Sequence, residues 1–189
     1  MIMRKFLSIV LLCWCHMAFA QQTPNWIVAQ NVDEFEDYAE GMYIATLVKD
    51  GKFSNSITSN ASLTVLITFH HKYGVFFNIK EYGKYLANFE GDAYLKAKGD
   101  SGKTGTFIMM SGSNGNLFPM RGGGNSSFSD FLDFIEMLKS ETNIKCRITN
   151  EDKSYLFTIN CIGFTKAYNE FLSKNKISTV PFRLRKDIR

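Results

Sequence analysis

The stretch Leu63-Thr64-Val65-Leu66-Ile67-Thr68-Phe69-His70 is the part of the chain that decides the fold class. Its odd-numbered residues are all apolar, which is the period-two pattern of a strand with one buried face. A turn signal at 73–74 follows, and residues 75–79 alternate in the same way. The two stretches therefore predict an antiparallel hairpin.

Stretches rich in β-branched and aromatic residues continue on both sides of this hairpin. Further strands are expected at 42–49, 52–55, 93–98, 106–110, 144–148 and 155–162. Asp50-Gly51 is predicted to be a turn between the first two of them. Turn signals recur about every ten residues among β-branched and aromatic residues, which favours an antiparallel β-sandwich or a curved sheet.

Two segments show helical periodicity instead. Residues 128–138 are preceded by Ser127, which resembles a capping residue with Asp130 three positions later. A second helix is expected at about 164–174. The predicted fold class is therefore α+β, mainly β, with two helices, in a single domain that spans residues 21–173.

The first twenty residues resemble a secretory signal peptide. A short positive start and a ten-residue apolar run lead to Ala18-Phe19-Ala20, the small-x-small pattern that signal peptidases recognise. Cleavage is expected between Ala20 and Gln21, which makes the protein secreted or periplasmic. A bacterial source is favoured, although a eukaryotic secretory route stays open. No later segment is apolar and long enough to predict a membrane span.

Charge is unevenly distributed along the chain. Without Arg4 and Lys5 of the leader, 20 basic and 18 acidic residues remain, a net charge of +2. Residues 174–189 form a basic tail of net +5, so the body carries −3, and no nucleic-acid partner is predicted. Arg183, Arg185 and Lys186 of the tail are candidates for contact with an acidic partner or surface, and a solvated chain end is the alternative.

Two cysteines, Cys146 and Cys161, lie outside the leader. A turn at 150–153 places Cys146 opposite Phe157 in the predicted hairpin, which leaves Cys161 about 13 Å further along. A disulfide requires Cα atoms within about 7 Å. Two buried thiols are therefore expected, unless a shifted register closes the gap.

The sequence lacks a recognisable reactive centre. His70 and His71 are neighbours in a strand and should point to opposite faces, with no further ligand at a metal-binding spacing. Residues 97–104 fit a loose phosphate-binding loop, but a strand pattern follows instead of the required helix. We predict a hairpin turn there, no metal or cofactor, and no catalytic residue.

The glycine-rich stretch 111–126 is expected to be a long loop. It contains Phe118, Met120 and Arg121, which could present apolar groups to a partner. The alternative is that the loop folds Phe118 and Met120 back onto the core.

The order of several short motifs resembles the TagO/VasI-like periplasmic domain associated with type VI secretion. The resemblance rests on Trp26-Ile27-Val28 with Asp33, on Phe128 with Phe131-Leu132, and on 156–159 with 163–168. The cysteines that members of that family commonly carry, one early and one terminal, are missing here. The resemblance implies a shared fold and a non-enzymatic role.

We therefore predict a non-catalytic accessory or binding protein of the cell envelope. Two alternatives stay open. One is a hydrolase or glycan-acting enzyme whose groups converge only in three dimensions, with His70 or His71 beside a carboxylate. The other is a carrier that holds a small apolar ligand in a cavity between the sheet and a helix.

Overall fold

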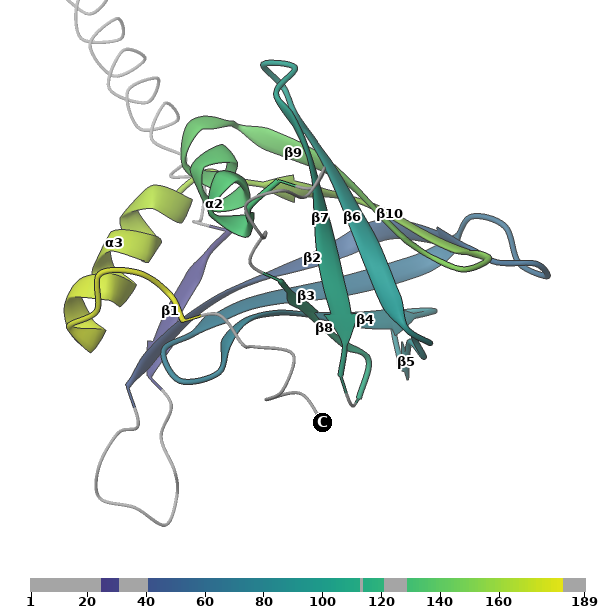
Figure 1. Ribbon diagram of the computed structural model, residues 1–189, viewed down its shortest axis with the longest axis horizontal. Helices are drawn as coiled ribbons and strands as arrows, with labels where there is room; N and C mark the ends of the chain where they lie inside the picture. Colours follow the sequence, from purple (N-terminus) through teal and green to yellow (C-terminus); the bar gives the residue numbers. More distant parts are fainter. Residues whose placement is uncertain (1–24, 31–40, 113, 121–128, 182–189) are drawn as a thin grey trace, which may run out of the picture.

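The protein is mainly β, with two helices at one end of a strongly curved sheet (Figure 1). The computed structural model describes residues 25–30, 41–112, 114–120 and 129–181. The strands are β1 (Ile27–Gln30), β2 (Met42–Ser54), β3 (Ala61–His70), β4 (Gly74–Glu81), β5 (Tyr85–Leu86), β6 (Asp92–Gly99), β7 (Thr104–Ser111), β8 (Asn116–Pro119), β9 (Asn143–Asn150) and β10 (Lys153–Asn160). The helices are α2 (Phe131–Ser140) and α3 (Phe164–Asn175).

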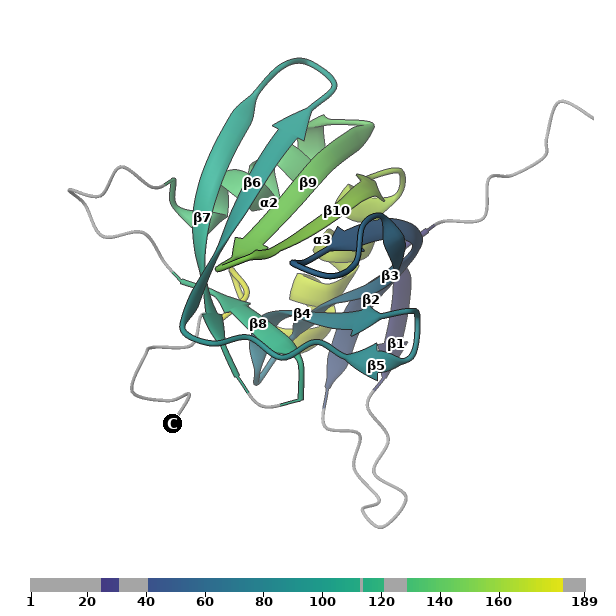
Figure 2. The ribbon, with the colours of Figure 1, turned by 90° about the vertical axis from the view of Figure 1, so that its right-hand side faces the viewer.

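Eight of these strands close into an antiparallel barrel (Figure 2). Their order is β2-β10-β9-β6-β7-β8-β4-β3, and β3 pairs back with β2. β1 lies outside this circuit on β2, and β5 lies outside it on β4. The mainly β class is as predicted, but a sandwich or an open curved sheet is not what forms. Alternation shows that one face is buried and does not show whether the two edges of the sheet meet.

Closure of the barrel depends on two local features that the sequence pattern did not predict. β8 lies within the stretch expected to be a loop, and it bridges β7 and β4. Asp50-Gly51 is not a turn, because β2 runs through it and its register against β3 shifts between Val48 and Gly51. Such a bulge bends a strand and increases its twist. β2 can therefore pair with β1 along its first half and with β10 at its end.

The other β-hairpins agree with the sequence. β9 and β10 pair with Cys146 opposite Phe157, as the predicted turn required. Both cysteines are free and buried, which confirms the two expected thiols. Residues 97–104 span the end of β6, the hairpin turn at 100–103 and the start of β7, and no helix begins there.

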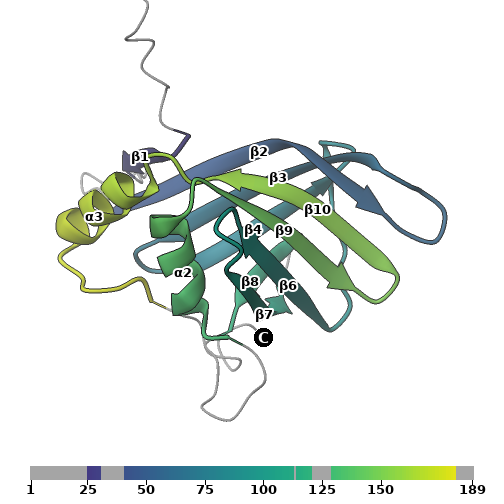
Figure 3. The same ribbon diagram turned by 90° about the horizontal axis from the view of Figure 1, so that it is seen from above.

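The helices close one end of the barrel (Figure 3). Asp130, rather than Ser127, caps α2, and its carboxylate accepts the Leu132 backbone N–H at 3.0 Å. Ser127 lies outside the described residues. Neither helix in the described part of the chain has the length and apolar character needed to cross a membrane.

Aromatic side chains fill the interior beneath the helices. Phe131 and Phe134 of α2 pack against Phe77 and Phe107 of the barrel wall, with ring centroids 5.5 to 6.4 Å apart. All four are completely buried. After α3 the chain folds back onto this core, where Val180 is also completely buried. The packed body therefore extends beyond residue 173.

The segment between β4 and β6 covers the opposite end of the barrel. Phe89 packs against Tyr155 at 5.4 Å, and the Tyr155 hydroxyl donates to Glu81 at 2.8 Å. The Asn150 side-chain amide donates to the backbone oxygens of Glu90 and Asp92. The barrel is therefore covered at both ends and packed between them.

Candidate functional site

Five cations lie together on the outer wall of the barrel. They come from the outward-facing positions of β2, β6 and β9, and all five residues are exposed. We call this set the basic face; it consists of Lys52, Lys96, Lys98, Lys145 and Arg147. Figure 2 shows β6, β9 and β10 running side by side, and the register of these strands with β2 sets the positions of the five cations.

Strand register places like charges directly opposite each other on this face. Lys96 pairs with Arg147, and Lys98 pairs with Lys145. Directly opposed like charges destabilise a sheet. Two charges roughly 7 Å apart in water repel by about 0.6 kcal/mol before salt screening. The barrel therefore carries a small, repeated penalty on this face.

The cations of the basic face are not neutralised by direct ion pairs within the part of the chain that the structure describes, although the Asp50 carboxylate lies beside Lys145 in the adjoining hollow. None of its five cations forms an ion pair or a side-chain hydrogen bond with a described residue. The described residues instead surround the cations with neutral hydroxyl groups, from Thr104, Thr106, Thr149, Ser154 and Thr158. The charges are consequently available to an external anion.

A shallow hollow adjoins the basic face between β2, β9 and β10. Its volume is about 230 Å³. Lys145, Asp50, Leu156 and Thr158 contribute to its lining. Leu156 is 39% exposed, so the hollow offers an aliphatic surface beside a carboxylate, a hydroxyl and an ammonium group.

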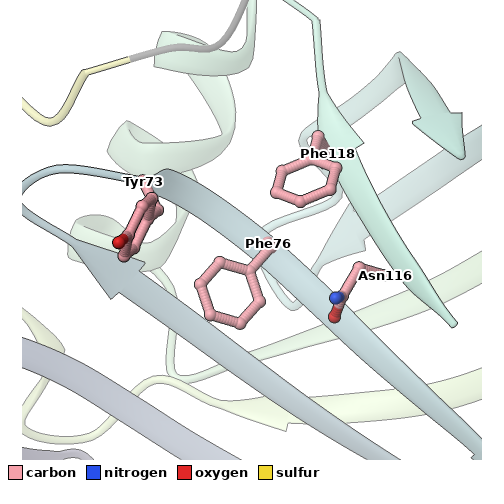
Figure 4. A pocket seen from close by; sticks show the side chains of 4 residues that line it. All are labelled: Tyr73, Phe76, Asn116 and Phe118. Carbon is pink, nitrogen blue, oxygen red and sulfur yellow. The ribbon is translucent and has the colours of Figure 1, made fainter. Parts of the chain in front are cut away.

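Phe118, the central residue of the predicted partner-binding loop, lies on the outer side of β8. It is only 7% exposed, and its ring centroid lies 6.0 Å from that of Phe76. Together with Tyr73 and Asn116 these two rings line a second pocket of about 230 Å³ (Figure 4). Phe118 is therefore a packed part of the wall and not a mobile exposed group.

The remaining predicted contact residues are distributed differently. Met120 is half-buried just after β8. Arg121, Arg183, Arg185 and Lys186 lie outside the described residues.

His70 takes a structural role in the turn after β3, whereas Nδ1 of His71 is buried and has no hydrogen-bond partner among the described residues. The backbone N–H groups of Lys72 and Tyr73 donate to Nδ1 of His70 at 3.1 and 3.2 Å. The rings of His70 and His71 lie 4.7 Å apart rather than on opposite faces, because His71 has already left the strand. Among the described residues, no group of three His, Cys, Asp or Glu side chains could hold a metal ion.

The two thiols are held in their unreactive, protonated form. Burial raises the pKa of the Cys146 thiol well above its ordinary value. Burial also raises the pKa of Cys161 to about 12, with smaller contributions from Glu141 and Asp100. Since the thiolate is the nucleophilic form, neither side chain is suited to covalent chemistry.

Sequence reasoning missed the basic face, although a local signal was present. Residues 96–98 and 145–147 each place two cations on one face of a strand, on either side of a buried small residue. These stretches lie almost fifty positions apart, and only the pairing of β6 with β9 brings them together. Summing charge over residues 21–173 hid the cluster behind acidic residues elsewhere.

Fold and surface together define the class of protein: a closed antiparallel barrel with a packed interior and a basic outer wall. No family model matches the chain, and no curated protein or solved structure matches it significantly.

Proposed function

We propose that the protein is an exported, non-catalytic binding protein of the cell envelope that acts through the outer wall of its barrel. The observation that carries this proposal is the basic face, whose five cations form no ion pair with a described residue. Exposed charge of one sign raises the local concentration of oppositely charged partners. The leader-like first twenty residues and the resemblance to TagO/VasI-like domains support an envelope location.

The packed interior argues against a small-ligand carrier. A carrier would need a cavity of several hundred cubic ångströms between the sheet and a helix. Phe77, Phe107, Phe131 and Phe134 fill the barrel beneath α2 and are completely buried. An apolar hollow of about 380 Å³ does lie between β1 and α3, lined in part by Trp26, Val28 and Ala167, and it is the place where the carrier alternative would have to act. Recognition at the outer wall is therefore the better supported mode.

Three of the four side chains that could have formed a reactive centre are unsuited to it, and the fourth is His71, whose buried Nδ1 has no hydrogen-bond partner among the described residues. Nδ1 of His70 accepts two backbone N–H groups, and the thiols of Cys146 and Cys161 have raised pKa values. These observations favour the binding role over the hydrolase alternative.

Co-sedimentation of the purified protein with insoluble cell-envelope material tests the proposal. Because the attraction is electrostatic, we expect retention at low ionic strength and release in about 1 M salt, where the Debye length falls to about 3 Å. Soluble protein at low ionic strength would contradict the proposal. Fractionation of cells that express the full chain tests the export step separately.

A further inference from the structure

We propose that the basic face binds a linear acidic polysaccharide, with a sugar unit seated in the hollow beside it. This inference rests on the proposed function, because it names the partner of the same surface. Its support is the geometry of the cations, the chemistry of the hollow and the absence of direct ion pairs between these cations and the described residues.

The cations form two parallel rows across the strands. Register aligns Lys52 of β2, Leu156 of β10, Arg147 of β9 and Lys96 of β6 in the first row. Neighbouring strands lie about 4.8 Å apart, so this row spans about 14 Å. A regularly charged polymer of a few sugar units can follow such a row, with its anionic groups over successive cations.

The second row lies two residues further along the strands. It aligns Thr158, Lys145, Lys98 and Thr104 at a distance of about 7 Å from the first row. Threonine hydroxyls at both of its ends can donate to or accept from sugar hydroxyls. A row that mixes charge with hydroxyl groups suits a polymer that carries both.

The hollow distinguishes a polysaccharide from other polyanions. Leu156 offers an apolar surface to the face of a sugar ring, while Asp50 and Thr158 can bond its hydroxyl edge. The Asp50 carboxylate accepts hydrogen bonds, which sugar hydroxyls can donate and the ionised phosphate groups of a bilayer or a nucleic acid cannot. Phe157 at the hollow is only 5% exposed, so it does not serve as a stacking platform for bases.

Binding of polygalacturonate, measured by calorimetry at low ionic strength, tests the inference. We expect the Lys96→Gln/Lys145→Gln variant to bind about thirtyfold more weakly, because each of the two cations near an anionic surface contributes about 1 kcal/mol. The matched control is Lys166→Gln/Lys174→Gln, which removes the same charge from exposed positions on α3. The control should bind as the unmodified protein does.

Asp50→Ala provides the sharper test, because sugar-specific binding and purely electrostatic binding predict opposite changes in affinity for polygalacturonate. If Asp50 bonds sugar hydroxyls, the substitution weakens polygalacturonate binding by about three- to tenfold. If attraction is purely electrostatic, removing a negative charge tightens it. Tighter binding by this variant would overturn the sugar-specific inference.

Binding to other polyanions, measured in the same way, tests whether the partner is an acidic polysaccharide. Phosphatidylglycerol vesicles or single-stranded DNA binding more tightly than polygalacturonate would overturn the assignment, as would an unchanged affinity in the Lys96→Gln/Lys145→Gln variant. Retention on envelope material without polygalacturonate binding would reject this inference and leave the proposed function standing. Loss of both would reject both.

Discussion

Replacing Lys96 with glutamate should stabilise the folded protein, although it removes a residue from the surface that we propose for binding. Lys96 lies directly opposite Arg147 in the β6–β9 ladder. Cβ atoms in such pairs are about 5 Å apart, which places the charged groups roughly 7 Å apart. At this distance the pair interacts by about 0.6 kcal/mol in water.

Charge reversal acts on this pair twice, because it removes a repulsion and adds an attraction. The unscreened gain is about 1.2 kcal/mol, and screening at 0.1 M ionic strength reduces it to about half. For a domain of this size, a gain of about 0.6 kcal/mol raises Tm by about 2 °C. Lys98 and Lys145, on the neighbouring positions, add smaller attractions of the same sign.

Thermal unfolding followed by circular dichroism measures this effect. Lys96→Gln should show about half of the gain, and Lys96→Arg, which keeps the charge, should show none. The gain should disappear in about 1 M salt. A lower Tm for Lys96→Glu, or a gain that salt leaves unchanged, would refute the electrostatic description of the basic face.

Three other predictions test the packing. Phe118→Asp should lower the free energy of unfolding by about 2–4 kcal/mol in urea titration, because the ring is 7% exposed, and unchanged stability would show that the side chain is not packed. Gly99→Ala should lower Tm by about 2–4 °C, because the new Cβ would displace the Glu141 carboxylate, which accepts the Ser101 backbone N–H in the β6–β7 turn. The decrease in Tm should be smaller when Gly99→Ala is made in a Glu141→Ala variant, which no longer has that carboxylate. The contribution of the two thiols to stability should be constant below about pH 8.5, their unfolded pKa, and should fall as pH rises toward 12, since folding raises the pKa values of Cys146 and Cys161. A Cys146→Ala/Cys161→Ala variant should therefore lose less stability between about pH 7 and pH 10 than the unmodified protein in urea titrations, and an equal loss would contradict this reasoning.

Local features of the fold were predictable where neighbouring residues supply the interactions. The β9–β10 register followed from a polar turn and two alternating stretches, and the free thiols followed from that register. α3 was predicted to within one residue of its observed end at Asn175. These elements depend on periodicity and turn chemistry that a short window of sequence contains.

The features that were predicted wrongly depend on residues distant in the sequence. The Asp50-Gly51 dipeptide favours a turn, yet β3 and β10 hold β2 extended on both sides of it. β8 has only four residues in a glycine-rich stretch, and it is a strand because β7 and β4 offer edges on either side. Tertiary pairing therefore overrode the local preference at both positions.

By itself the sequence determined which face of most strands is buried and where most strands and both helices lie, and it favoured two free cysteines over a disulfide. Only the tertiary structure decided that the sheet closes, that aromatic rings fill it, and that cations from three separate strands share one face. The physical reason is that alternation is encoded by adjacent residues, whereas closure and charge clustering depend on which strand edges pair. Which edges pair depends on the free energy of the whole barrel, to which residues far apart in the sequence contribute.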